Sequence, residues 1–144
     1  MNIGKFVLNV VAAFLVYGIL YALVMPMIFP EAMESLMAAS RPPEEAMIPE
    51  LAYHLVQAIV VVWLFDKAVG SGDMKAGAMF GLMIGFYLMA TDSVWFTALK
   101  DFPAQDARFG LSIMNLVNST IVGAFLAFMH GKGWGASSDE APAE

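Results

Sequence analysis

The chain has 144 residues, of which 60% are hydrophobic and 14% are charged, and its formal net charge is −6. A soluble domain usually carries about 25% charged residues, so a water-soluble fold would expose far too much apolar surface. The composition therefore predicts a membrane protein. The negative charge argues against nucleic acid as a partner, because nucleic-acid binding needs basic patches. The absence of cysteine excludes disulfides and thiolate metal sites.

Four apolar segments are long enough to cross a bilayer, which takes about 20 residues in a helix. The segments 6–29 and 109–130 contain no Asp, Glu, Lys or Arg, and 76–99 contains Asp92 alone. The segment 51–65 is shorter and lies between acidic residues. We therefore predict an all-α integral membrane protein, a four-helix bundle of two helical hairpins within residues 1–132, with spans near 5–29, 48–69, 75–99 and 108–130.

The regions outside the spans carry weaker signals. The first apolar run is much longer than the roughly 7–15 apolar residues of a secretory signal, so we expect a retained helix. Between the first two spans, Pro30 to Pro42-Pro43 has the pattern of a short helix with a start and a stop. Its Met33, Leu36 and Met37 are expected on the membrane surface. The acidic, Pro- and Ala-rich tail 133–144 is expected to be disordered.

The orientation follows from the basic residues. With four spans, the four residues Lys5, Lys67, Lys75 and Lys132 share one side of the membrane. Arg41, Lys100 and Arg108 lie on the other, where the first loop is also acidic. Because cytoplasmic loops are enriched in Lys and Arg, this slight excess predicts that both termini are cytoplasmic.

Small residues recur every four positions on the last two spans. Such spacing lets two helix backbones approach closely, and dispersion and weak hydrogen bonds then hold them together in lipid. We expect the cytoplasmic halves of these helices to pack against each other, with a homo-oligomer contact as the alternative. The stripes are Gly77, Gly81 and Gly85 on the third span and Ser119, Gly123, Ala127 and Gly131 on the fourth.

Asp92 is the only Asp, Glu, Lys or Arg that lies well inside a predicted span. Its insertion costs about 2.5–3.5 kcal/mol on translocon scales, so it should face the bundle, a partner or water. It follows Gly85 by seven residues, which at about 100° per residue returns it to nearly the same helix face. Burial would favour its neutral form. A rise of about 1.5 Å per residue brings further polar side chains to a similar depth, so we predict a polar cluster of Tyr21, His54, Gln57, Asp92, Asn115 and Asn118.

Several roles for this cluster remain open at the level of sequence. Asp92 could be satisfied by neighbouring amides and set the helix register, without further function. The cluster could form a pocket for a small lipophilic or polar ligand, or handle protons or ions through Asp92 and His54. Tyr53, Trp95 and Phe96 could line the mouth of such a pocket or form an aromatic belt at the membrane interface.

Other chemistries have weaker support. His54 and Asp92 are only two good metal ligands, and His130 lies at the other end of the bundle. The twelve methionines could bind Cu(I), but methionine is also a routine packing residue. No nucleophile–base pair, phosphate loop or dinucleotide motif is present, so we assign no catalytic residue and no metal, and the cofactor remains unknown.

Parts of the sequence resemble each other, and other parts resemble known membrane proteins. His54 to Gln57 resembles Asn115 to Asn118, since each quartet places two polar residues three apart, and a duplicated two-helix unit would explain this. The stretches Gly81-Leu-Met-Ile-Gly85-Phe and Leu111-Ser-Ile-Met-Asn115-Leu-Val-Asn118, continuing to Gly123, resemble small four-helix bacterial inner-membrane proteins of unknown function. The resemblance implies the architecture and the bacterial inner membrane, and it carries no activity.

From these observations we predict a non-enzymatic membrane protein, either an accessory subunit or a small-ligand binder. The alternative is a small transporter or proton-coupled carrier that uses Asp92, and the third possibility is an enzyme acting on a lipid-soluble substrate. The expected partners are the lipid bilayer and a larger membrane complex or a second copy of the chain.

Overall fold

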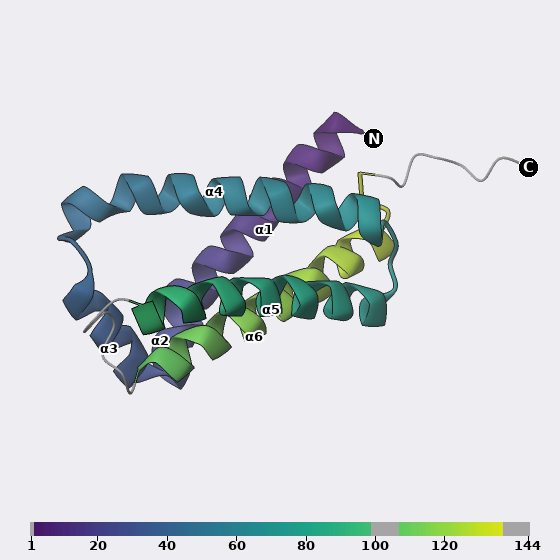
Figure 1. Cartoon of the computed structure of the whole chain (residues 1–144). Coiled ribbons are helices and arrows are strands. Elements are labelled where there is room, and N and C mark those ends of the chain that lie inside the picture. Colours follow the sequence, from purple (N-terminus) through teal and green to yellow (C-terminus); the bar gives the residue numbers. More distant parts are fainter. Residues whose placement is uncertain (1, 99–106, 137–144) are drawn as a thin grey trace, which may run out of the picture.

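The computed structural model describes residues 2–98 and 107–136, and all regular secondary structure within them is helical (Figure 1). Four helical segments are long and apolar enough to cross a membrane. The predicted all-α fold with four membrane-spanning helices is therefore confirmed, and the chain has the architecture of a multi-pass membrane protein. The spans are Ile3–Ile28, Pro43–Ala68, Met74–Val94 and Arg108–Gly131.

The first span is not a regular α-helix along its whole length. Helix α1 (Ile3–Ile19) continues into a π-helical turn, η1 (Leu20–Val24), and then into α2 (Met25–Ile28). Pro26 explains the change, because proline has no N–H to donate and its ring clashes with the carbonyl four residues earlier. The turn before it widens, and the Met25 N–H bonds the Leu20 carbonyl five residues back. The sequence analysis did not predict this turn.

The segment after the first span forms the short helix α3 (Pro30–Ala39), as its proline-initiated pattern predicts. Its three apolar residues, which could lie on the membrane surface, differ in their surroundings. Met33 and Leu36 pack against a buried cluster that includes Met25, whereas Met37 is 71% exposed. Helix α3 contacts both α2 and α6. Met33 and Leu36 therefore cover the apolar cluster that these two helices form.

Helix α4 (Pro43–Ala68) begins five residues before the predicted position 48. The proline pair Pro42-Pro43 is typical of the end of the preceding helix, but Pro43 occupies the first turn of α4 instead. Proline suits this position because its missing N–H would have no helical partner there. Glu44 and Glu45 in the same turn add favourable interactions with the helix dipole.

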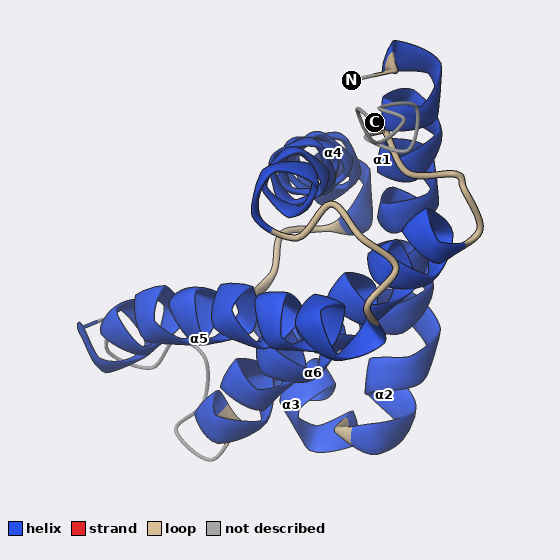
Figure 2. Cartoon of the chain, turned by 90° about the vertical axis from the view of Figure 1, so that its right-hand side faces the viewer, coloured by secondary structure: helices blue, strands red, loops and turns tan. Residues whose placement is uncertain are grey.

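Helices α5 (Met74–Ala98) and α6 (Arg108–Gly131) lie side by side along their length, and α4 packs mainly on α1 (Figure 1). These pairs are the two predicted hairpins. Helix α1 also contacts α6, so the main apolar core lies between α1, α4 and α6, around Tyr17, Phe65 and Leu126. Figure 2 views α4 nearly end-on while α5 runs across the view, so these two helices diverge from their connecting turn.

The sequence predicts a disordered tail from residue 133, but residues 133–136 are part of the described fold. Gly133 has a positive φ of 76°, which turns the chain back after α6. The Trp134 carbonyl then accepts from the Asn9 amide at 2.7 Å, and the Ala136 carbonyl accepts from the Asn2 N–H at 2.9 Å. Residues 133–136 therefore pack on the start of α1, and the remainder of the predicted tail lies outside the described residues.

Candidate functional site

Three helical segments meet at a chain of hydrogen bonds around Asp92. The Tyr21 hydroxyl, on the π turn of the first span, donates to Asn115 Oδ1 on α6. The amide nitrogen of Asn115 donates to Asp92 Oδ2 on α5. One asparagine therefore uses its acceptor and its donor to join the other two elements. The sequence analysis placed all three residues at one depth, and the structure brings them into direct contact.

The close approach of α5 to α6 allows Asp92 to reach Asn115. A Cβ built on Gly85 would lie 2.7 Å from the Leu116 Cα, nearer than real Cβ contacts allow. Glycine at this position therefore brings the α5 backbone against α6 immediately before the polar layer. We call the part of the bundle with Tyr21, Asp92 and Asn115 the Asp92 half, and the opposite part the His130 half.

His54 and Gln57 lie beside this chain on α4. His54 Nδ1 and Gln57 Oε1 are 3.2 Å apart, and because the amide oxygen is an acceptor, Nδ1 is assigned the proton in this pair. The His54 ring lies 5.4 Å from the Tyr21 ring and 5.2 Å from the Tyr53 ring, centroid to centroid. The two predicted residues thus join the cluster through an aromatic contact with Tyr21.

Asn118, the remaining residue of the predicted cluster, is fully buried, and neither its Oδ1 nor its Nδ2 has a hydrogen-bond partner among the described residues. The same holds for the Tyr17 hydroxyl and the Ser119 hydroxyl, which lie beside each other. Asn118 is in turn next to Tyr21. The Tyr17 hydroxyl interacts with Ser119 and the Tyr21 hydroxyl with Asn118, so these buried groups have polar neighbours although they lack a full hydrogen bond. Together they extend the hydrogen-bonded chain into a buried polar layer.

Tyr17 was missed at the sequence level. It precedes Tyr21 by four residues and therefore lies near the same face of the first span, which is the signal that could have found it. Ser119 was assigned to packing alone. Its backbone carbonyl does lie under Gly81, while its hydroxyl belongs to the buried polar group.

The two small-residue stripes meet along α5 and α6. A Cβ on Gly77 would lie 2.6 Å from both the Ala127 Cβ and the Gly123 carbonyl oxygen. Gly81 packs against the backbone of Ser119. Gly131 faces Gly72, a glycine in the α4–α5 connection that the sequence analysis did not single out. The contact is therefore intramolecular and reaches the end of α6.

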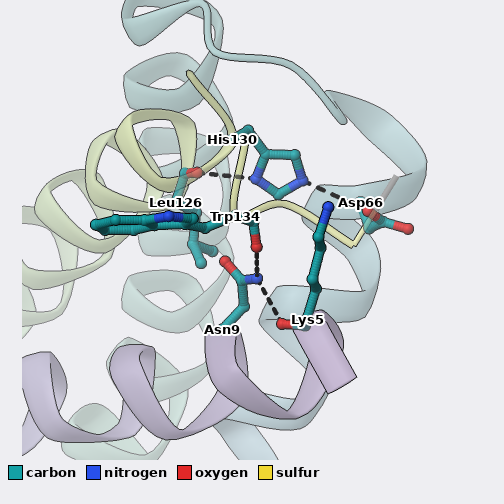
Figure 3. A network of polar contacts seen from close by, with 6 residues as sticks. All are labelled: Lys5, Asn9, Asp66, Leu126, His130 and Trp134. Carbon is teal, nitrogen blue, oxygen red and sulfur yellow. Dashed lines mark hydrogen bonds and ion pairs between the residues drawn. The ribbon is translucent and has the colours of Figure 1, made fainter. Parts of the chain in front are cut away.

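A second polar network lies in the His130 half (Figure 3). His130 Nδ1 is 2.9 Å from the Leu126 carbonyl, and Nε2 is 3.4 Å from Asp66 Oδ1 on α4. The His130 and Asp66 side chains are 3% and 4% exposed. His130 follows Asn115 by fifteen residues on α6, or about 22 Å along the axis. The sequence predicted this separation but not the pairing with Asp66.

Other candidate features are less developed. No three His, Cys, Asp or Glu side chains of residues 2–98 and 107–136 gather where they could hold a metal ion. A cavity of about 320 Å³ lies at the α2–α3 junction, lined by apolar residues, Pro30 and Glu31. Tyr53 is 58% exposed, and the side chains of Trp95 and Phe96 lie outside the described part of the structure.

Comparison of this chain with protein-family models, with curated proteins and with solved structures found no match.

Proposed function

We propose that this protein is a non-enzymatic membrane protein that binds a small ligand in the Asp92 half of its bundle. The observation that carries the proposal is the Tyr21–Asn115–Asp92 chain. It fixes a carboxyl group inside a membrane-spanning bundle, and among the described residues no Lys, Arg or His forms an ion pair with it. Ionisable groups at such depth are costly and are retained mainly where they bind or transfer something.

A role limited to setting the helix register fits less well. One carboxylate oxygen of Asp92 accepts from Asn115, and the side chain stays partly exposed at the edge of the α5–α6 pair. A group that served only to join helices would be expected to direct both oxygens inward.

We further propose that the protein lies in the bacterial inner membrane and contacts lipid, a larger complex or a second copy of the chain. The resemblance to small bacterial inner-membrane proteins and the basic residues support a multi-pass protein of that membrane, with both termini cytoplasmic and the Asp92 half towards the outside. Among the described residues of α5, only Gly77, Gly81 and Gly85 are buried. Most of the surface of this helix therefore faces away from the bundle. This surface suits lipid, a larger membrane complex that would make the protein an accessory subunit, or a second copy.

A proton-coupled carrier that uses Asp92 is the second candidate. It is favoured by the asymmetry of the bundle, which is polar around Asp92 and apolar where Val62, Val122 and Leu126 meet beyond it. A carrier would hold its ligand at Asp92 and open the apolar part in another state. Uptake into proteoliposomes under an imposed proton gradient, compared with the D92N variant, tests this candidate directly.

The binding proposal is tested by purification in mild detergent followed by native mass spectrometry. Asp92→Asn keeps a side chain of the same shape that can still pair with Asn115, but removes the charge. We expect the wild type to carry a small molecule that D92N loses, while both give the same helical circular dichroism and elution volume. Glu34→Gln, on the exposed surface of α3, is the matched control. Equal retention by D92N, or normal expression, oligomeric state and growth with Asp92→Leu, would count against the proposal.

The orientation is tested separately, and the lack of cysteine makes this simple. Ser40, between α3 and α4, and Ser71, between α4 and α5, are both exposed and lie at opposite ends of α4. In intact cells a membrane-impermeant maleimide should label Ser40→Cys, whereas Ser71→Cys should react only after permeabilisation. The reverse pattern would invert the proposed topology.

A further inference from the structure

A continuous set of aromatic rings lies beside Asp92. Tyr21 is joined to Asp92 through Asn115, and the rings of Tyr21, His54 and Tyr53 follow one another at centroid distances of 5.4 and 5.2 Å. We propose that the ligand of the Asp92 half is a lipophilic organic cation, which Asp92 holds by charge and the exposed Tyr53 holds by its ring face. Tyr21, which lies between the rings of Tyr17 and His54, supports this arrangement from inside the bundle. This inference rests on the proposed function and names the ligand class for the same site.

Charge selects a cation. Within the described residues Asp92 accepts one hydrogen bond from an uncharged amide and makes no ion pair. A carboxylate in a low-dielectric surrounding is strongly stabilised by a positive partner and destabilised by a negative one. Burial alone favours the neutral form of Asp92, and a bound cation supplies the charge that stabilises the ionised form. An anion would meet repulsion, and a neutral molecule would leave the ionised form uncompensated.

The rings reinforce the same selection. The face of a tyrosine ring carries negative electrostatic potential and attracts a cation within about 6 Å of the ring centre, most strongly where water is excluded. Tyr21 is partly buried, and Tyr53 keeps 58% of its surface exposed beside His54. An ammonium or phosphonium group near Asp92 would therefore meet the exposed Tyr53 ring, which disfavours an anion.

The approach to the site selects a lipophilic body. Helices α4 and α5 diverge from their connecting turn towards the Asp92 half, and they make few contacts with each other (Figures 1 and 2). Exposed apolar side chains such as Val56 on α4 and Val94 on α5, at 60% and 63%, face out of the bundle at this level. A ligand that enters between these helices passes through lipid, which favours an organic cation over a hydrated inorganic one.

The test uses two probes of nearly equal size and shape but opposite charge, tetraphenylphosphonium and tetraphenylborate. Each is titrated by equilibrium dialysis against the full chain in nanodiscs, with empty nanodiscs of the same lipid measuring partition into the bilayer. We expect saturable binding of tetraphenylphosphonium to the wild type, at least tenfold tighter than tetraphenylborate. D92N should lose that binding by tenfold or more, and Asp92→Glu, which retains the charge, should recover part of it. E34Q should match the wild type.

The aromatic part is tested at Tyr53, which no described hydrogen bond requires. Tyr53→Leu removes the ring face and should weaken tetraphenylphosphonium binding by about two- to fivefold. Tyr53→Phe keeps the ring and should bind as the wild type does. Equal loss in both variants would overturn the contribution of the ring.

The outcomes separate the two proposals. If D92N loses the co-purified molecule but tetraphenylphosphonium neither binds nor displaces it, the ligand site stands and the cation class is wrong. If tetraphenylborate binds the wild type as tightly as tetraphenylphosphonium, or D92N and wild type bind the cation equally, the cation class is also wrong. If D92N in addition retains the co-purified molecule, both proposals fail.

Discussion

The two halves of this bundle are held together by different means. In the His130 half, α5 and α6 approach through glycine, and α1, α4 and α6 enclose an apolar core around Phe65 and Leu126. In the Asp92 half, long polar and aromatic side chains join the first span, α5 and α6 beside a smaller apolar cluster around Met25 and Met114. Three buried polar side chains there lack a full hydrogen bond among the described residues. The same pair of helices thus changes from backbone contact to side-chain contact along its length.

This difference suggests a division of roles along the membrane normal. Close backbone packing leaves little freedom and no room for a ligand, so it suits a part of the bundle that sets the fold. Polar side chains with spare hydrogen-bonding capacity are costly for the fold and suit a part that binds. Substitutions should therefore act mainly on stability in the His130 half and mainly on binding in the Asp92 half.

The largest effect is expected at the buried pair of the His130 half. Asp66→Ala removes the acceptor 3.4 Å from His130 Nε2 and leaves a polar ring in a buried position. Breaking such a pair typically costs about 3–5 kcal/mol. We expect a loss of about 3 kcal/mol in the unfolding free energy, measured by denaturant titration in mixed micelles. The double variant Asp66→Leu with His130→Phe should recover most of it, and a failure to recover would show that the pair stabilises more than its apolar replacement.

The glycine contact should give the next largest effect. Gly81→Ala places a Cβ against the Ser119 backbone, which cannot yield as a flexible side chain can. We expect a destabilisation of about 2 kcal/mol from overpacking, seen as a lower thermal midpoint in detergent. Gly18→Ala is the matched control, because nothing lies within 4 Å of its Cβ position, and it should be neutral or slightly stabilising. Similar effects of the two changes would contradict the proposed role of the glycine stripe.

A moderate effect is expected at Asn115. Asn115→Leu removes the acceptor of Tyr21 and the donor to Asp92 together. The expected cost is about 1–2 kcal/mol, because two partly buried polar groups lose their partner. Since Asp92 is then held less firmly, a carbodiimide should modify it faster than in the wild type, as quantified by peptide mass spectrometry. Unchanged stability and labelling would show that the chain through Asn115 holds nothing in place.

The smallest effect on stability is expected three residues further along the same helix. Asn118→Leu keeps a similar volume and removes two buried polar atoms that have no described partner. We expect the unfolding free energy to stay within about 0.5 kcal/mol of the wild type or to rise, because only a weak interaction with the Tyr21 hydroxyl is lost. The same thermal melts measure it. A loss as large as that of N115L would mean that Asn118 is satisfied within the folded protein.

Features that depend on composition and periodicity could be predicted from the sequence. The spans follow from the length of the apolar runs, and the α5–α6 contact follows from small residues at four-residue intervals. The association of Asp92 with Asn115 and Tyr21 follows from helix phase and depth, two quantities that a regular helix geometry determines. Each of these inferences uses residues within one helix or a common position along the membrane normal.

Features that depend on local exceptions or distant partners could not be predicted. Pro43 begins α4, whereas α3 already ends at Ala39, and the sequence does not distinguish a proline that starts a helix from one that follows its end. Asp66 and His130 are 64 residues apart, so their pairing depends on how α4 crosses α6. The return of 133–136 depends on the positive φ of Gly133 and on the Asn9 amide, neither of which a composition typical of disorder reveals.

The π turn in the first span has a consequence for the phase of that helix. Four buried residues, Asn9, Ala13, Tyr17 and Met25, are separated by multiples of four, yet four residues of an α-helix rotate about 400°, or about 40° beyond a full turn. The wider turn at Leu20–Val24 rotates less per residue and so corrects this drift. Deleting one residue there would leave the hydropathy of the span almost unchanged but swing its end by about 100°, turning Met25 away from α3 and α6. The extra residue works as a spacer that aligns the two ends of one helix with different partners.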